Sequence, residues 1–357
     1  GAVPRDQAPG ARVDRETAGG GAPGVLAETF DTGPQEHIYL EPQAMAAWYS
    51  EGRITVRGSM QCPYYVKKAL TTLFGWDENR IRVVQATTGG AFGGKEEYPS
   101  VLAGYVALAA RKSGRPVRLV LDRGEDITIT TKRHPSRTTF STTTSPDGAP
   151  VDTRVDLRTD GGAYEGLSST VLQRAIFSTN GVYRFPRTTV RGRSYRTNAV
   201  PYGAFRGFGS PQALFAIEMH MTHLARLCGE DPLAYKRRHL LRRGDLTITG
   251  GTLRDPVLLD EMIDHVVEAS DYTRKRKAYG PGASVARGIG VSIFNHGCGF
   301  TGSGERDIIK ARVRLRRTAT DAVEILCANV EMGQGAVTTL RKIVAETMGM
   351  EIDNVIF

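Results

Sequence analysis

A glycine-rich loop is the first segment whose residue types and spacing could do chemistry. Residues 87–97 read TTGGAFGGKEE, and Gly89, Gly94 and Lys95 have the spacing of a P-loop that binds nucleoside triphosphates. A P-loop needs Ser or Thr after the lysine because that hydroxyl binds Mg²⁺, and here the position is Glu96. The glycine fingerprint of dinucleotide-binding folds is not matched either. The run could instead place backbone N–H groups around a bulky anionic or oxo-bearing ligand, and a plain tight turn is an equal alternative.

Three further segments combine glycines with aromatic or polar side chains. They are residues 203–212 (GAFRGFGSPQ), 297–305 (GCGFTGSGE) and 331–335 (EMGQG). Because one turn can satisfy only a few ligand oxygens, several such loops favour a large phosphorylated or oxo-bearing cofactor that is held at several points.

The elements that must position these loops can be predicted from hydrophobic periodicity. A strand at residues 81–85 runs directly into the first glycine loop. We expect further strands at 54–57, 117–121, 311–315 and 322–327, a hairpin of 137–144 with 151–158, and helices at 65–74, 100–111, 213–227, 257–269 and 337–347. A helix also follows Pro232, and a basic link covers residues 273–281.

Composition bounds the class of protein. The chain has 357 residues, 40% hydrophobic and 24% charged, which is typical of about two globular domains. The net charge is +9, but the basic runs at 237–243 and 274–277 have no interleaved aromatic residues. We therefore expect no nucleic-acid partner, and interpret these runs as a solvated helix face or a surface for a partner subunit.

Cysteine usage and hydropathy limit the metal sites and the cellular locations that the sequence predicts. The four cysteines form no C-x-x-C pair, which argues against an iron–sulfur site on this chain and is simplest to reconcile with a cytoplasmic location. No apolar run approaches the roughly 20 residues of a membrane span. The first residue is not Met and no apolar signal segment follows, so we expect a fragment or a processed product.

Four motifs in a fixed order carry a family resemblance. Residues 33–42 (GPQEHIYLEP), 89–96 (GGAFGGKE), 203–212 and 331–335 resemble the molybdenum-cofactor-binding subunit of the xanthine dehydrogenase/aldehyde oxidase family, with similarity from about residue 31 to the end. The resemblance implies an α+β fold in which two large domains enclose a molybdopterin, usually the cytosine dinucleotide form in bacteria. It also implies that [2Fe-2S] clusters and FAD are carried by partner domains or subunits.

The resemblance, together with composition, predicts the domain boundaries of the chain. We expect a flexible N-terminal linker at 1–30, a first cofactor-binding domain at 31–245, a connecting segment at 246–285 and an incomplete second cofactor-binding domain at 286–357. There are two departures from the family pattern. Ala91 replaces the usual middle glycine, and the chain stops at Phe357, before the later G-x-G-E segment that supplies the family's glutamate base.

The resemblance also implies cofactor-binding residues. In the first loop these are Gly90, Ala91, Phe92 and Gly93, and in the other loops Arg206, Gly333 and Gln334. The molybdenum itself, held through the cofactor, is expected beside Gln61, Phe92 and Arg206. The alternatives are a helix-capping role for Gln61 and a buried structural ion pair for Arg206.

Substrate-facing residues follow in the same way. Glu96 and Arg174 match the catalytic carboxylate and guanidinium that flank the purine in xanthine-oxidising members, where the cation stabilises negative charge developing on the ring. Phe208 and Phe300 match two aromatic residues that sandwich the ring, with Thr301 beside them. Arg174 could otherwise be a surface residue, and Phe300 a core residue.

The predicted function is that of a molybdenum hydroxylase subunit that hydroxylates a purine or related N-heterocycle with oxygen from water. Its partners would be iron–sulfur and FAD subunits or domains and the remainder of the molybdenum domain. The alternatives are oxidation of an aldehyde or of a non-purine heterocycle such as nicotinate, and a catalytically incomplete subunit for cofactor binding or assembly.

Overall fold

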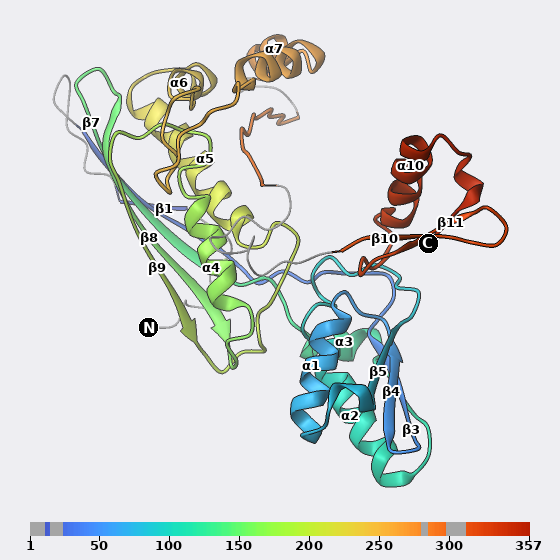
Figure 1. The fold of residues 1–357 in the computed structure, drawn as a ribbon. Helices are drawn as coiled ribbons and strands as arrows, with labels where there is room; N and C mark the ends of the chain where they lie inside the picture. The colour runs from blue at the N-terminus through green and yellow to red at the C-terminus, as the bar shows by residue number, and fades with distance from the viewer. Residues whose placement is uncertain (1–10, 15–23, 280–284, 298–311) are drawn as a thin grey trace.

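The computed structural model describes residues 11–14, 24–279, 285–297 and 312–357. Within these ranges the chain forms three β-sheets with helices packed against them, which confirms the predicted α+β class (Figure 1).

The largest sheet has five strands in the order β1-β2-β7-β8-β9. These are β1 Ala11–Asp14, β2 Val25–Thr32, β7 Ser136–Thr144, β8 Pro150–Gly162 and β9 Thr188–Arg196. The predicted hairpin is confirmed as the antiparallel pair β7–β8, and β9 joins β8 in parallel. The predicted linker at 1–30 is wrong for the part that forms β1 and β2, because Leu26, Glu28 and Phe30 alternate into a buried face.

Helices α4 (Ser168–Phe177) and α5 (Ser210–Leu227) lie across one face of this sheet (Figure 1). Their core contains Phe30, Phe140 and Ile217. Three helices follow, α6 Pro232–Arg238, α7 Leu259–Ala269 and α8 Tyr272–Ala278. Most of the basic link predicted at 273–281 is therefore helical.

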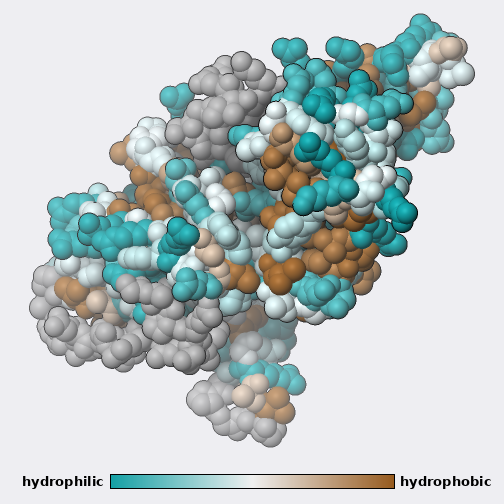
Figure 2. All heavy atoms as spheres, turned by 90° about the horizontal axis from the view of Figure 1, so that it is seen from below, coloured by the Kyte–Doolittle hydropathy of each residue, from teal (hydrophilic) through white to brown (hydrophobic). Residues whose placement is uncertain are grey.

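A second sheet has the order β5-β4-β3-β6. Its strands are β3 Ala44–Ser50, β4 Arg53–Gly58, β5 Ile81–Gln85 and β6 Val117–Val120. Helices α1 (Pro63–Phe74) and α2 (Pro99–Ser113) cover one face, the 3₁₀ turn η1 (Glu78–Arg80) precedes β5, and α3 (Arg123–Ile129) follows β6. Some apolar side chains of α1 and α2 stay exposed, among them Tyr64 and Tyr105. Seen from below, apolar and hydrophilic areas alternate on the surface (Figure 2).

The C-terminal part forms a small sheet of β10 (Arg314–Arg317), β11 (Val323–Leu326) and β12 (Val355–Ile356). Helix α10 (Ala336–Met348) and the 3₁₀ turn η2 (Ile352–Asn354) complete it. Residues 286–293, expected to begin this second unit, form no strand, and Ile293 instead packs into the core of the five-stranded sheet. Among the described residues, no helix is long and apolar enough to cross a membrane.

Candidate cofactor and substrate site

The first glycine loop follows β5 and touches a second loop through its backbone. Gly90, Phe92 and Gly93 have φ values of 88°, 54° and 102°. A Cβ atom on Gly93 would lie 2.6 Å from the carbonyl oxygen of Ala204, so only glycine permits this approach. The Arg206 N–H donates to the carbonyl oxygen of Phe92 at 2.9 Å. Two of the predicted cofactor loops are therefore joined directly.

Gln61 is bound to the first loop by both its backbone and its side chain. Its amide oxygen accepts hydrogen bonds from the N–H groups of Gly93 (2.8 Å) and Lys95 (3.3 Å), and its own N–H donates to the Lys95 carbonyl (2.7 Å). The helix-capping alternative is wrong, because no side chain caps α1. Since the amide oxygen is occupied, the NH₂ group is the end of Gln61 that is oriented to donate to a ligand.

Lys95 points into the protein. Its side chain is fully buried, its ammonium lies 3.0 Å from a carboxylate oxygen of Glu41, and it sits 4.6 Å from the centre of the Tyr39 ring. The same oxygen of Glu41 accepts the N–H of Gly89 at 2.6 Å. Lys95 therefore holds the two ends of the loop together, whereas a P-loop lysine must reach phosphates outside the loop.

The second loop has three residues with positive φ and an exposed arginine. Phe208 has φ 49°, and the neighbouring glycines at 207 and 209 each have φ 92°. His37 bonds to the Ala204 carbonyl through Nε2 at 2.8 Å and stacks on Phe205 with ring centroids 4.3 Å apart. The Arg133 guanidinium lies 3.9 Å from the Phe205 ring centroid and donates to the carbonyl of Arg206 at 3.0 Å. The side chain of Arg206 is exposed, so the buried ion-pair alternative is wrong.

The third loop, residues 331–335, meets the end of β5. The Gln85 side chain donates to the Glu331 carbonyl at 3.1 Å, two residues before the first loop begins. The Glu331 carboxylate accepts the N–H groups of Gly335 and Val337 at the start of α10. Gly333 and Gln334 are exposed, and the Gln334 amide is bonded within its own loop, to the Val330 carbonyl at 2.7 Å. Three predicted cofactor loops thus lie next to one another.

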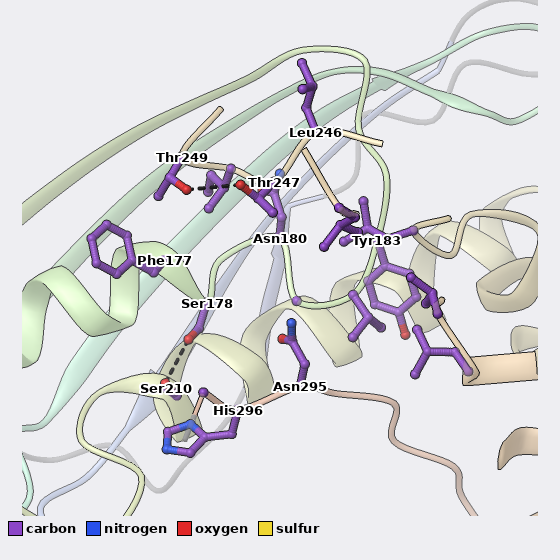
Figure 3. A pocket seen from close by; sticks show the side chains of 18 of the residues that line it. Phe177, Ser178, Asn180, Tyr183, Ser210, Leu246, Thr247, Thr249, Asn295 and His296 are labelled. Atoms are coloured by element: carbon purple, nitrogen blue, oxygen red, sulfur yellow. Dashed lines mark hydrogen bonds between the residues drawn. The ribbon is translucent and has the colours of Figure 1, made fainter. Parts of the chain in front are cut away.

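A cavity of about 1350 Å³ brings together three predicted substrate residues. Glu96, Arg174 and Phe208 all line it, from the first loop, α4 and the second loop. Asn295 and His296 lie near Ser210 on one side, and Leu246, Thr247 and Thr249 come from a loop on the opposite side of the view (Figure 3). The predicted residues Phe300 and Thr301 lie outside the described part of the chain. Gln61, Phe92 and Arg206 are not among the described residues that line this cavity.

Two adjacent carboxyl groups face low-dielectric surroundings. Burial raises the pKa of Glu96 to about 7. Burial, reinforced by the charge of Glu96, raises the pKa of Glu97 to about 7 as well. A carboxyl group with such a pKa can hold or release a proton near neutral pH.

Sequence reasoning missed Glu97 and the cavity residues Tyr183, Asn295 and His296. Cβ atoms on Gly166 and Gly203 would each lie 2.6 Å from a Glu97 carboxylate oxygen, so these glycines leave a slot for that side chain. Glu97 ends the first glycine loop, so its place next to Glu96 was a signal that could have found it. Tyr183, Asn295 and His296 belong to no local motif, and only the folded chain brings them to the site.

Two family models match the chain. One model of a molybdopterin cofactor-binding domain matches residues 6–240, and a second model of a molybdopterin cofactor-binding domain matches residues 265–357.

Several known proteins are similar in sequence. A xanthine dehydrogenase from Emericella nidulans is 32% identical over 96% of this chain and 25% of its own length. A probable xanthine dehydrogenase subunit from Bacillus subtilis is 32% identical over 93% of this chain and 44% of its own. The nicotinate dehydrogenase large molybdopterin subunit from Eubacterium barkeri is 34% identical over 71% of this chain and 60% of its own.

Solved structures match the fold over nearly the whole chain. An aldehyde oxidoreductase from Desulfovibrio gigas superposes with a TM-score of 0.84 at 25% identity, covering 97% of this chain and 38% of that one. Quinoline 2-oxidoreductase from Pseudomonas putida gives 0.78 at 26% identity, covering 94% and 44%. The chain thus spans between 25% and 60% of the length of these relatives. With both cofactor-domain models matched in order, the chain belongs to the xanthine dehydrogenase/aldehyde oxidase family, in its molybdopterin-cofactor-binding part.

Proposed function

We propose that the chain is the cofactor-binding part of a molybdenum hydroxylase, and that the assembled enzyme hydroxylates a purine or a related electron-poor N-heterocycle with oxygen from water. The observation that carries the proposal is the shared cavity of Glu96, Arg174 and Phe208, which come from three separate segments.

The loops fit a molybdopterin by the chemistry of their donors. The NH₂ group of Gln61, the exposed guanidinium of Arg206 and the glycine-rich backbone around Phe92 are neutral or cationic donors, as an anionic oxo-bearing group requires. The acidic side chain of Glu331 is directed to the start of α10 instead. When bound, the molybdenum cofactor supplies the redox chemistry of hydroxylation. The cytosine dinucleotide form belongs to the proposal.

The cavity residues have separate tasks toward a heterocycle. Phe208 offers an aromatic face on which a planar ring can stack. Arg174 places a cation where negative charge develops on the ring during attack, and Glu96 can share a proton with a ring nitrogen because its pKa is near neutral.

Partners and setting are also proposals. Two of the similar proteins are named as subunits, which supports the presence of partner chains in the assembled enzyme. The proposal assigns [2Fe-2S] clusters and FAD to those partners and a cytoplasmic location to the enzyme. The second candidate function is aldehyde oxidation, which is favoured by the structural similarity to an aldehyde oxidoreductase with a TM-score of 0.84.

Substitution of Arg174 by Met in the assembled enzyme tests the purine proposal. We expect kcat/KM for hypoxanthine to fall by about 10² to 10³, because one preorganised donor in a catalytic site is worth roughly 3–4 kcal/mol. A simple aromatic aldehyde develops no ring charge and should react at an unchanged rate.

The comparison is made at equal molybdenum content, with Arg191→Met on the exposed side of β9 as the control. Equal losses on the purine and the aldehyde, or no loss on the purine, would remove the main support for a heterocyclic substrate.

A further inference from the structure

Residues 289–297 connect the core of the five-stranded sheet to the substrate cavity without forming a helix or strand. At one end, Ile293 is only 5% exposed and packs in the core with α5 and α6 residues. At the other end, Asn295, His296 and Gly297 line the cavity that also contains Glu96 and Phe208 (Figure 3). The position of this segment therefore decides the shape of one cavity wall.

A buried ion pair holds the segment by its backbone. The Glu218 carboxylate, on α5, accepts the Lys236 ammonium at 2.8 Å and the Ile293 N–H at 3.0 Å through the same oxygen. Its other oxygen accepts the hydroxyl of Tyr183, which lines the cavity. The Lys236 ammonium also donates to the Val291 carbonyl at 3.3 Å. One carboxylate and one ammonium thus bind the backbone on both sides of residue 292.

This pair is too deeply buried to be explained as a simple gain in stability. Glu218 is 7% exposed and Lys236 is 3% exposed. A buried ion pair is often no more stabilising than a pair of apolar residues of similar volume, because both charges lose their hydration. An apolar pair could not, however, satisfy the N–H of Ile293 and the carbonyl of Val291, which have no strand partner to bond.

We propose that Glu218 and Lys236 are positioning residues that fix residues 289–297 so that Asn295 and His296 form one wall of the substrate cavity. The kinetic consequence rests on the proposed function, whereas the structural consequence for the segment does not.

The test uses the assembled enzyme with Lys236→Met. We expect KM for hypoxanthine to rise at least about tenfold with a smaller change in kcat, because the wall that contacts the bound ring is misplaced while the cofactor loops are not. Amide hydrogen exchange of the peptide covering 289–297 should accelerate at least about tenfold, since the Val291 carbonyl loses its donor and Glu218 loses the cation that holds it against the Ile293 N–H. The control is Arg238→Met on the same helix, whose 2.8 Å ion pair with Glu230 is solvent-exposed and should affect neither measurement.

A second variant keeps the test informative if Lys236→Met does not fold. In Glu218→Leu combined with Lys236→Met no charge is left unpaired, so thermal stability should return toward wild type, but the backbone groups at 291 and 293 still lack partners. KM and exchange should therefore stay raised. Wild-type KM and exchange in this double variant would overturn the proposal, because the pair would then be replaceable by packing alone.

The variant His296→Ala distinguishes the effect of moving residues 289–297 from the effect of losing a side chain that contacts the substrate. We expect KM to change while exchange of 289–297 stays at the wild-type rate. An unchanged KM would mean that this wall does not meet the substrate, and would overturn the proposal. If the wild-type enzyme oxidises the aldehyde but no heterocycle, the proposed purine function fails. The hydrogen-exchange rates of residues 289–297 and the KM for the aldehyde then still test whether Glu218 and Lys236 position the segment.

Discussion

Gly93→Ala should separate the two cofactor loops. The backbone at Gly93 has φ 102°, which L-residues rarely adopt, and forcing it costs roughly 1–3 kcal/mol. The new Cβ would lie 2.6 Å from the Ala204 oxygen and 2.8 Å from the Phe205 Cα. Both contacts are with backbone, so no side-chain rotation relieves them.

The magnitude follows from the movement needed. Bringing the 2.6 Å contact to an ordinary 3.4 Å requires a shift of about 0.8 Å, enough to break the 2.9 Å hydrogen bond from Arg206 N–H to the Phe92 carbonyl. That bond contributes about 1 kcal/mol. With the backbone strain, the total is roughly 2–4 kcal/mol, equivalent to a fall in Tm of about 3–5 °C for a chain of this size.

Gly114→Ala is the matched control. Gly114 ends α2 with φ 65°, and a Cβ there would meet nothing within 4 Å. Its cost is limited to backbone strain of about 1 kcal/mol, or roughly 1–2 °C. Differential scanning calorimetry gives the two Tm values, and the molybdenum-to-protein ratio should fall only for Gly93→Ala. Equal Tm shifts with equal molybdenum content would refute the reasoning that the loop junction depends on Gly93.

Two further outcomes can be measured. Burial lowers the pKa of His37 to about 4, so the unfolded chain binds more protons between pH 6.5 and 4. The contribution of neutral His37 to the free energy of unfolding is therefore complete above about pH 6.5 and falls with acidification, by roughly 2 kcal/mol at pH 5. Urea titrations at pH 7 and 5 should show this loss of stability, and the loss should be smaller in His37→Asn. Gly203→Ala would place a Cβ 2.6 Å from a Glu97 carboxylate oxygen, so this variant should have a lower Tm. Adding Glu97→Ala should recover part of the lost Tm. Strictly additive losses of Tm in the double variant would contradict the inference that Gly203 leaves room for the Glu97 side chain.

Local signals made much of the fold predictable. The apolar alternation of β5 followed by glycines predicted a strand that runs into a loop, and the structure has the strand at Ile81–Gln85. The β7–β8 hairpin and α2 were predictable for the same reason, since their periodicity and turn residues are local.

Elements that depend on distant partners were not predictable. In β2, Glu28 is a buried carboxylate, which argues against a half-buried strand until its partners are known. Those partners are His220 and His223 on α5, at 3.3 and 3.0 Å. Strand β3 was missed because three of its seven residues are Ala, which is depleted in strands, and its pairing with β4 and β6 decides its conformation.

The residues of the candidate site also divide into those that the sequence predicts and those that only the folded structure shows. The motifs identified the loops because these loops need glycines, and a glycine requirement is visible in the sequence. Several side chains that hold the glycine-rich loops lie outside those loops. Gln61 and Glu41 orient the first loop through its N–H groups, and His37 and Arg133 support the second. Because these supporting residues set the geometry of the loops, changes to them should impair the proposed cofactor binding without altering any residue of the glycine-rich loops.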